Sequence, residues 1–203
     1  MIDWSIRLPD QVVVTGTSSG LGQETARLLL DTGVRVYGVD VAEAAVDLGK
    51  SEAFTVVALQ ALLPLLTAAD HGAAVAVSSV NAQFGEQQLA AYSSSKAALT
   101  GAVRTIALDY ARRGVQINIL APGPMRAGLF ERHLASAADP AKFLATRQAR
   151  QPIGRIPGAD EVARAALFLL SSAASAVFGS TLTADGGLTA GFDFRTGEEG
   201  SSA

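Results

Sequence analysis

The stretch that decides the fold is VVVTGTSSGLG, residues 12–22. Its three β-branched valines are typical of a buried strand, and a Gly-rich turn follows them directly. A helical stretch over residues 23–31 ends at Gly33, and VRVYGVD, residues 34–40, has the composition of a second strand. This order of strand, turn, helix and strand predicts a right-handed βαβ unit in a parallel sheet.

The Gly-rich turn is a candidate phosphate site. Glycine permits a tight turn and lets a pyrophosphate approach the backbone N–H groups at a helix N-terminus. The alternative is a turn that needs glycine only because its backbone adopts positive φ angles and that binds no ligand. The flanking strand and helix favour nucleotide binding. The candidate cofactor-binding residues here are Gly16, Ser18, Ser19, Gly20, Leu21 and Gly22.

Asp40 ends the second strand and bears on the choice of cofactor. A carboxylate at this place can accept hydrogen bonds from ribose hydroxyls, and it would repel a 2′-phosphate. The turn contains no Lys or Arg that could neutralise such a phosphate. Both features favour NAD over NADP, although an aspartate that only caps the next segment would look the same.

The rest of the chain continues the α/β pattern. Further helices are expected over 51–70, 90–113 and 160–171, and further strands over 73–79, 115–120 and 181–184. Residues 125–158, with possible short helices at 129–134 and 141–150, form an excursion from this pattern. We expect one domain over residues 1–196 and a disordered tail over 197–203.

Composition excludes several classes of function. The chain has 203 residues, of which 49% are hydrophobic and 17% charged, as in a globular domain. It has no cysteine and two histidines, so disulfides, a cysteine nucleophile and a thiolate or histidine metal site are not expected. A net charge of −3 favours neither nucleic acid nor an anionic membrane as partner. The chain shows neither a signal peptide nor a membrane-spanning apolar run, so we expect a cytoplasmic protein.

Three residues suggest acid–base chemistry. Tyr92 and Lys96 are four residues apart on one expected helix and therefore share a face. Ser79 stands at the carboxyl end of a strand, where ligands bind in open α/β sheets. A nearby ammonium stabilises a phenolate. Tyr92 could then exchange a proton with an alcohol or a carbonyl, with Ser79 hydrogen-bonded to the same oxygen.

Together these motifs resemble those of the short-chain dehydrogenase/reductase family. TGTSSGLG, Ser79, YSSSK (92–96), NILAPGP (118–124) and LTADGG (182–187) occur in the family's order along nearly the whole chain. The resemblance implies a Rossmann-like doubly wound sheet and NAD(P)-dependent interconversion of alcohols and carbonyls. It implies Ser79, Tyr92 and Lys96 as catalytic residues, with Lys96 also holding the nicotinamide ribose and Pro122 and Gly123 lying against the nicotinamide. It further implies that 125–158 is a substrate lid and that the chain forms a homodimer or homotetramer.

The chain departs from that family between Asp40 and Ser51. Too few residues lie there for one strand, one helix and another strand, so about one strand–helix–strand module is missing. If the gap closes, the strand order becomes 2-1-3-4-5, and Ser79 and Tyr92 shift by one strand spacing, ~4.8 Å, relative to the turn. The less favoured alternative is that FTVVAL, residues 54–59, forms a substitute strand. A gapless match puts Ser51 where the family has a catalytic asparagine.

The favoured function is an NAD(H)-dependent oxidoreductase acting on a secondary alcohol or ketone. One alternative is a non-catalytic relative that serves as an oligomer-forming or regulatory subunit through residues 90–113. A second alternative is a flavin- or phosphate-binding module that has the strand order 2-1-3-4-5. The substrate is not readable, although several apolar residues suggest an apolar lid: Leu129, Phe130, Leu134, Phe143 and Leu144.

Overall fold

The computed structural model describes residues 6–39 and 51–191. Its strands are β1 (Gln11–Thr15), β2 (Arg35–Val39), β3 (Ala73–Val77), β4 (Gln116–Pro122) and β5 (Thr181–Ala184). Its α-helices are α1 (Gly20–Asp31), α2 (Ser51–Ala68), α3 (Ala90–Ala111), α4 (Leu129–Ser136), α5 (Pro140–Ala149) and α6 (Ala159–Leu170), with short 3₁₀ helices η2 (Val80–Ala82) and η3 (Ser172–Ala174). The predicted parallel α/β class is confirmed. Asp40 and the predicted tail lie outside the described residues.

The N-terminal βαβ unit forms as predicted. β1 and β2 pair in parallel, with Val13 opposite Tyr37. α1 connects them and packs over them, so that Leu29, Val14 and Val34 make a small core. The helix starts at Gly20, three residues earlier than the sequence pattern indicated, because the turn itself becomes the first helical turn.

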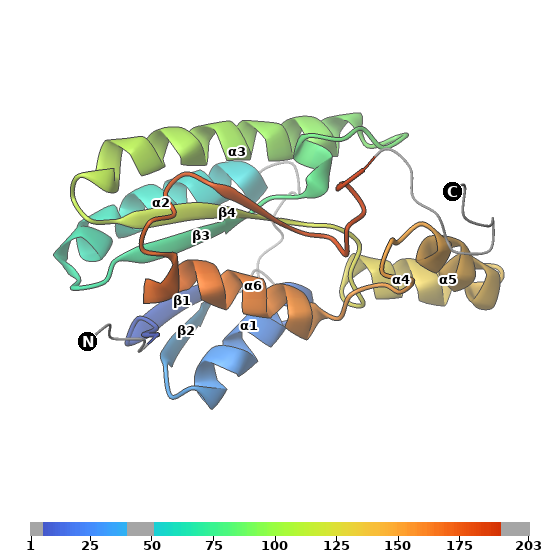
Figure 1. Ribbon diagram of the computed structural model, residues 1–203, viewed down its shortest axis with the longest axis horizontal. Coiled ribbons are helices and arrows are strands. Elements are labelled where there is room, and N and C mark those ends of the chain that lie inside the picture. Colours follow the sequence, from blue (N-terminus) through green and yellow to red (C-terminus); the bar gives the residue numbers. More distant parts are fainter. Residues whose placement is uncertain (1–5, 40–50, 192–203) are drawn as a thin grey trace, which may run out of the picture.

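The second unit is a three-stranded parallel sheet in the order β3-β4-β5. β4 is buried along its whole length, as a central parallel strand should be. Figure 1 shows α2 and α3 on one side of this sheet and α6 on the other. Residues 54–59 lie within α2, so no substitute strand forms there.

The strand order needs one correction. The continuous order 2-1-3-4-5 is wrong, because β1 and β2 form one sheet and β3, β4 and β5 another, with no ladder between β1 and β3 among the described residues. Val13 on β1 is 43% exposed and Val77 on β3 is 41% exposed. Closing the gap would carry α1 by about one strand spacing, ~4.8 Å, and α1 already packs against α6. Helix packing therefore holds the two sheets apart.

α6 is the element that joins the two units. Leu167 packs into the core of the βαβ unit with Val14 and Leu29. Leu169 belongs to a second cluster with Leu120 of β4. One helix thus buries side chains in both cores, and Figure 1 shows it running between the two sheets.

The excursion over 125–158 carries two short helices, as predicted. α4 and α5 pack against each other and project from one end of the molecule, at the right of Figure 1. Asp139 caps α5, because its side chain accepts a hydrogen bond from the N–H of Lys142 at 2.9 Å. α4 and α5 follow the carboxyl end of β4 in the chain, and their assignment as a substrate lid stays a prediction.

Candidate active site

The Gly-rich turn has the backbone geometry of a phosphate cradle. Gly16 (φ +73°) and Gly20 (φ +60°) adopt the left-handed conformation that favours glycine. A Cβ on Gly22 would lie 2.2 Å from the carbonyl oxygen of Gly16, so the first turn of α1 packs directly on the turn. Ser19 caps α1 without a side-chain hydrogen bond, which leaves the helix N–H groups facing outward for an anion. The residues present fit a dinucleotide pyrophosphate.

The turn lies beside the carboxyl end of the second sheet even though the two sheets do not pair. The Cα of Gly128, at the start of α4, is 3.7 Å from where a Cβ on Gly20 would stand. Leu21 packs against the cluster that contains Leu120 and Val162. These contacts bring the end of β1 next to the end of β4, where ligands bind in this class of fold.

Ser79 follows β3 and is buried. It caps η2, and its Oγ accepts a hydrogen bond from the N–H of Asn81 at 3.1 Å. The neighbouring Ser78 has a different role, because its Oγ pairs with Oγ1 of Thr100 at 2.9 Å and ties β3 to α3. Ser79 is therefore the serine of this pair that stands at the candidate site.

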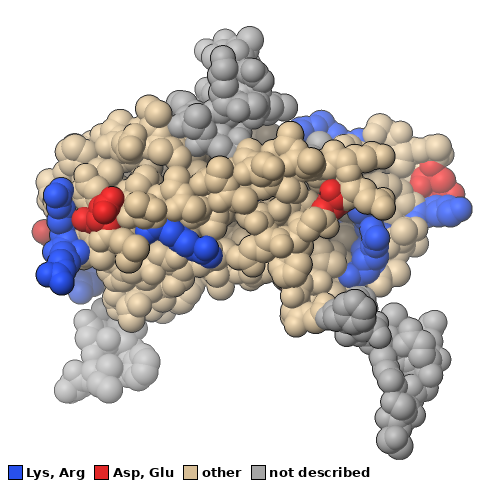
Figure 2. All heavy atoms as spheres, turned by 90° about the horizontal axis from the view of Figure 1, so that it is seen from above, with Lys and Arg blue, Asp and Glu red and all other residues tan. Residues whose placement is uncertain are grey.

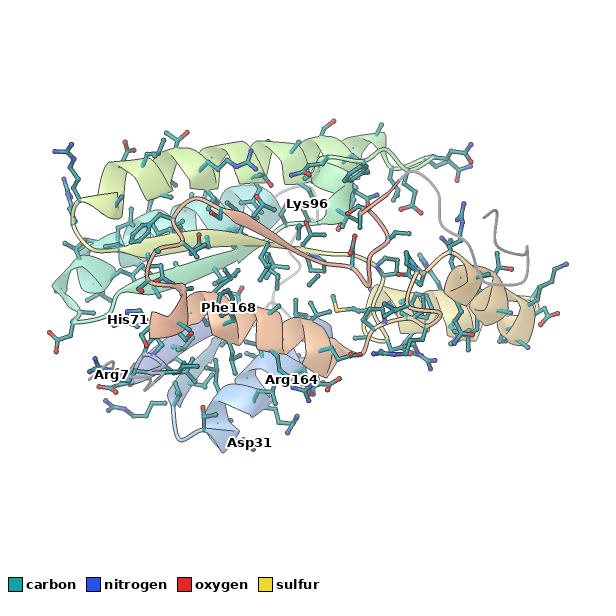
Figure 3. The ribbon with its side chains drawn as sticks, in the orientation of Figure 1. Arg7, Asp31, His71, Lys96, Arg164 and Phe168 are labelled. Atoms are coloured by element: carbon teal, nitrogen blue, oxygen red, sulfur yellow. The ribbon has the colours of Figure 1, made fainter. Side chains whose placement is uncertain are left out.

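Tyr92 and Lys96 meet on the first turns of α3. The Nζ of Lys96 lies 5.7 Å from the centre of the Tyr92 ring, which permits a cation–π contact. The same Nζ donates to the carbonyl oxygen of Val77 at 3.4 Å, two residues before Ser79. Figure 3 shows Lys96 on the side of α3 that faces the strands. α3 also packs on η2, so the helix that carries Tyr92 and Lys96 lies against the segment that begins at Ser79, while the Tyr92 side chain is 41% exposed.

Pro122 and Gly123 end β4 against the segment that follows β5. A Cβ on Gly123 would lie 2.7 Å from the Cβ of Asp185. Asp185 is buried and accepts hydrogen bonds from the N–H groups of Gly187 and Thr189 at 2.9 Å each. Asp185, the aspartate of LTADGG, thus stabilises the turn that follows it and packs against the end of β4.

A polar chain that the sequence did not reveal leads away from Ser79. Asn81 donates through Nδ2 to Oε2 of Glu86 at 3.0 Å. The other oxygen of Glu86 lies 3.8 Å from Nη1 of Arg147 on α5. Arg147 stacks over Phe143, whose ring centre is 5.8 Å from that of Phe130 on α4. The contact between Glu86 and Arg147 joins segments far apart in the chain, so the local sequence pattern does not indicate it.

Some predicted residues have no described surroundings. Asp40 lies outside the described residues, and of Ser51 only its place at the start of α2 is described. Their assignments therefore stay predictions. Over residues 6–39 and 51–191, acidic and histidine side chains form no group of three or more suited to a metal ion. No helix in the same ranges combines the length and apolarity that crossing a membrane requires.

Comparison with known proteins points to oxidoreductases. Residues 50–189 match the sequence family described as enoyl-(acyl carrier protein) reductase. The cis-4-hydroxycyclohexanecarboxylate dehydrogenase of Sinomonas cyclohexanicum is 43% identical over 129 residues, which are 62% of this chain and 48% of that protein. The chain thus spans about half the length of the curated relatives it matches.

Solved structures share the fold over most of the chain. The 3-alpha-hydroxysteroid dehydrogenase from Pseudomonas sp. B-0831, complexed with NADH, is 28% identical with a TM-score of 0.71, covering 89% of this chain and 97% of that one. A short chain oxidoreductase from Pseudomonas aeruginosa PAO1, bound to NADPH and containing an atypical catalytic centre, is 26% identical with a TM-score of 0.75, covering 88% and 96%. Similar proteins therefore bind either nicotinamide cofactor.

Proposed function

Because the chain belongs to the short-chain dehydrogenase/reductase family, we propose that it is an NAD(H)-dependent oxidoreductase that interconverts a secondary alcohol and a ketone. The observation that carries the proposal is the pairing of Tyr92 and Lys96 on α3, with the Lys96 ammonium reaching the strand end that leads to Ser79. The Gly-rich turn beside the end of β4 supplies a second support.

Each of the three side chains has a distinct role in this proposal. The cofactor, when bound, supplies the hydride acceptor for the carbinol carbon. Tyr92 takes the hydroxyl proton during oxidation and returns it to the ketone oxygen during reduction. The Lys96 ammonium, 5.7 Å from the centre of the Tyr92 ring, would hold the nicotinamide ribose. Ser79 hydrogen-bonds the reacting oxygen and so fixes its position near Tyr92.

The interrupted sheet favours activity. A closed sheet would have moved Tyr92 by about 4.8 Å relative to the turn, and 1 Å of misplacement can cost about a hundredfold in rate. Because β1 and β3 are unpaired, the displacement of Tyr92 that a closed sheet would produce does not arise. α1 packs against α6, which ties the Gly-rich turn to the second sheet without a strand ladder.

We propose NAD as the cofactor, with Asp40 accepting hydrogen bonds from the adenosine ribose. Replacing this carboxylate by a small neutral group removes the repulsion of a 2′-phosphate. Asp40→Ser is therefore expected to lower the ratio of kcat/KM for NAD to that for NADP by at least about tenfold. An unchanged ratio would contradict the role of Asp40 without touching the roles of Tyr92 and Lys96.

The test of the function is turnover of purified protein with NAD and a panel of secondary alcohols. The panel includes cyclohexanol and cis-4-hydroxycyclohexanecarboxylate, the compound for which the relative from Sinomonas cyclohexanicum is named. NADH formation is expected, and Tyr92→Phe should reduce it by about 10²- to 10⁴-fold. The matched control is Tyr110→Phe at the opposite end of the same helix, which should leave turnover unchanged.

A negative result has a definite meaning in this design. If the wild-type protein forms no NADH with any alcohol, and calorimetry detects no binding of NAD or NADH at millimolar concentration, the oxidoreductase proposal fails. The non-catalytic alternative would then hold. If turnover occurs and Tyr92→Phe retains it, the proton-transfer role of Tyr92 is wrong.

We further propose that the protein forms a homodimer or homotetramer in the cytoplasm, using α3. Figure 2, which views the α3 side of the molecule, shows a mostly uncharged surface. Leu108 on α3 is 78% exposed, which favours burial against another copy. Light scattering of the wild type should give a multiple of the 20.8 kDa chain mass, and Leu108→Glu should shift it toward the monomer.

A further inference from the structure

A cation and two aromatic rings form one surface on the lid helices, which we call the lid patch: Phe130 on α4 with Phe143 and Arg147 on α5. The guanidinium carbon of Arg147 lies 5.3 Å from the centre of the Phe143 ring. The two phenylalanine rings are 5.8 Å apart at their centres and inclined by 51°. All three side chains are half-buried. The patch therefore combines an apolar wall with a positive charge at its edge.

The lid patch is connected to the segment that carries Ser79. Glu86 accepts a hydrogen bond from Asn81, two residues beyond Ser79, and its other oxygen faces Arg147. Asn81 in turn donates its backbone N–H to Ser79 Oγ. A chain of polar contacts through Glu86 and Asn81 thus links the guanidinium of Arg147 to the Ser79 hydroxyl.

Arg147 is weakly engaged by its acidic partner. Its separation from Glu86 is 3.8 Å, whereas the other ion pairs of the described residues are 2.5 to 2.8 Å long. The side chains of Arg147 and Glu86 are 35% and 49% exposed, so the pair gains little from their mutual attraction. A guanidinium carries five N–H donors in a fork that matches a carboxylate, and this single long contact leaves most of that capacity for another anion.

We propose that the lid patch binds a carboxylate on the substrate, which makes the substrate a cyclic secondary alcohol that carries a carboxylic acid, or the corresponding keto acid. This inference rests on the proposed function, because it places the alcohol end at Tyr92 and Ser79. The carboxylate pairs with Arg147, and the ring packs against Phe143 and Phe130. Glu86 remains bonded to Asn81.

The position of Glu86 gives the proposal a second consequence. An incoming carboxylate competes with Glu86 for Arg147 and is repelled by its charge. Glu86→Gln keeps a side chain that can accept from Asn81 but removes that repulsion. Affinity for an acidic substrate should therefore fall when Arg147 is neutralised and rise when Glu86 is neutralised, a pair of opposite effects that general damage to the lid would not produce.

The experiment compares two substrates that differ in one group. cis-4-Hydroxycyclohexanecarboxylate and cis-4-methylcyclohexanol share the ring and the hydroxyl, and only the first carries a charge. Arg147→Gln should raise the KM of the acid about 10- to 100-fold, the loss expected for a hydrogen bond to a charged group, and should leave the KM of the methyl compound within about twofold. Glu86→Gln should lower the KM of the acid. Arg150→Gln, at the exposed end of the same helix, is the matched control and should change neither value.

The outcomes separate this inference from the proposed function. If wild-type turnover depends on Tyr92 but Arg147→Gln leaves the KM of the acid unchanged, the lid patch inference is overturned and the oxidoreductase stands. Equal losses on both substrates would also overturn it, since they indicate a structural role. Calorimetry with cyclohexanecarboxylate, which has no hydroxyl to oxidise, tests the patch without turnover. Binding by the wild type that is lost in Arg147→Gln supports the inference, and absence of binding by the wild type overturns it.

Discussion

Gly22→Ala tests whether the Gly-rich turn is built for close approach of a ligand. The added Cβ would lie 2.2 Å from the carbonyl oxygen of Gly16 and 2.7 Å from that of Thr15. Carbon–oxygen contacts in proteins are ~3.3 Å or longer, so α1 and the turn must separate by roughly 1 Å. Such overpacking costs about 1–3 kcal/mol of stability. It also moves the N–H donors of α1 away from the pyrophosphate.

We expect Gly22→Ala to lower cofactor affinity as well as stability. One hydrogen bond to a charged group contributes about 1.5–3 kcal/mol, so losing one corresponds to a roughly 10- to 150-fold higher Kd for NADH. Calorimetric titration measures the Kd, and urea denaturation measures the free energy of unfolding of the same sample. We expect both to change in Gly22→Ala.

The matched control is Gly33→Ala, at the other end of α1. Gly33 has a φ of +82°, and a Cβ there meets no atom within 4 Å. The substitution should therefore cost about 1–2 kcal/mol through backbone strain and leave the Kd for NADH unchanged. If Gly22→Ala binds NADH within about threefold of wild type while Gly33→Ala behaves as stated, the assignment of the turn as a phosphate cradle is refuted.

Two further predictions concern α6. The Arg155 side chain and the N–H of Gly158 lower the pKa of Glu161 from 4.5 to about 2. The stabilising contribution of Glu161 is therefore complete above pH 4.5 and is lost as the pH falls through about 2. In acid denaturation the difference in unfolding free energy between wild type and Glu161→Gln should shrink over that range, and a constant difference would contradict the pairing of Glu161 with Arg155. Leu169 is 1% exposed, so Leu169→Ala should destabilise the protein by about 2–5 kcal/mol in urea. Leu30→Ala on α1, where the side chain is 59% exposed, should change stability by less than about 0.5 kcal/mol, and equal effects would contradict the role of α6 in the core.

Local pattern was enough to predict the N-terminal unit. The valine run, the glycines and the second valine-rich strand act on neighbours within a few residues, and β1, α1 and β2 formed in that order. The errors at this level are boundaries, such as the start of α1 at Gly20. The proximity of Lys96 to Tyr92 also followed from spacing, because i,i+4 residues on a helix share a face, whereas the assignment of Ser79, Tyr92 and Lys96 as catalytic residues stays a prediction.

Contacts between distant segments could not be predicted in the same way. Glu86 and Arg147 are both ordinary surface residues in the sequence, and they lie far apart in the chain although their side chains meet in the fold. The same holds for Leu167, which resembles any apolar residue of an amphipathic helix but packs into the core of the other unit. Hydrophobic periodicity indicates that a face is buried without indicating which element covers it.

The absence of pairing between β1 and β3 also depends on contacts between segments that are far apart in the chain. Pairing β1 with β3 would have satisfied their open backbone edges and given the order 2-1-3-4-5 that was expected if the gap closed. Val13 and Val77 are exposed, so the neighbouring N–H and C=O groups on those edges can bond to water instead, and leaving them unpaired costs little. Bringing the strands together would break the packing of Leu167 and of α1 on α6, and burial of such side chains contributes about 1.5–3 kcal/mol each. The balance favours two sheets joined by a helix, and the distance from the Gly-rich turn to Tyr92 is then set by α6 and not by a strand ladder.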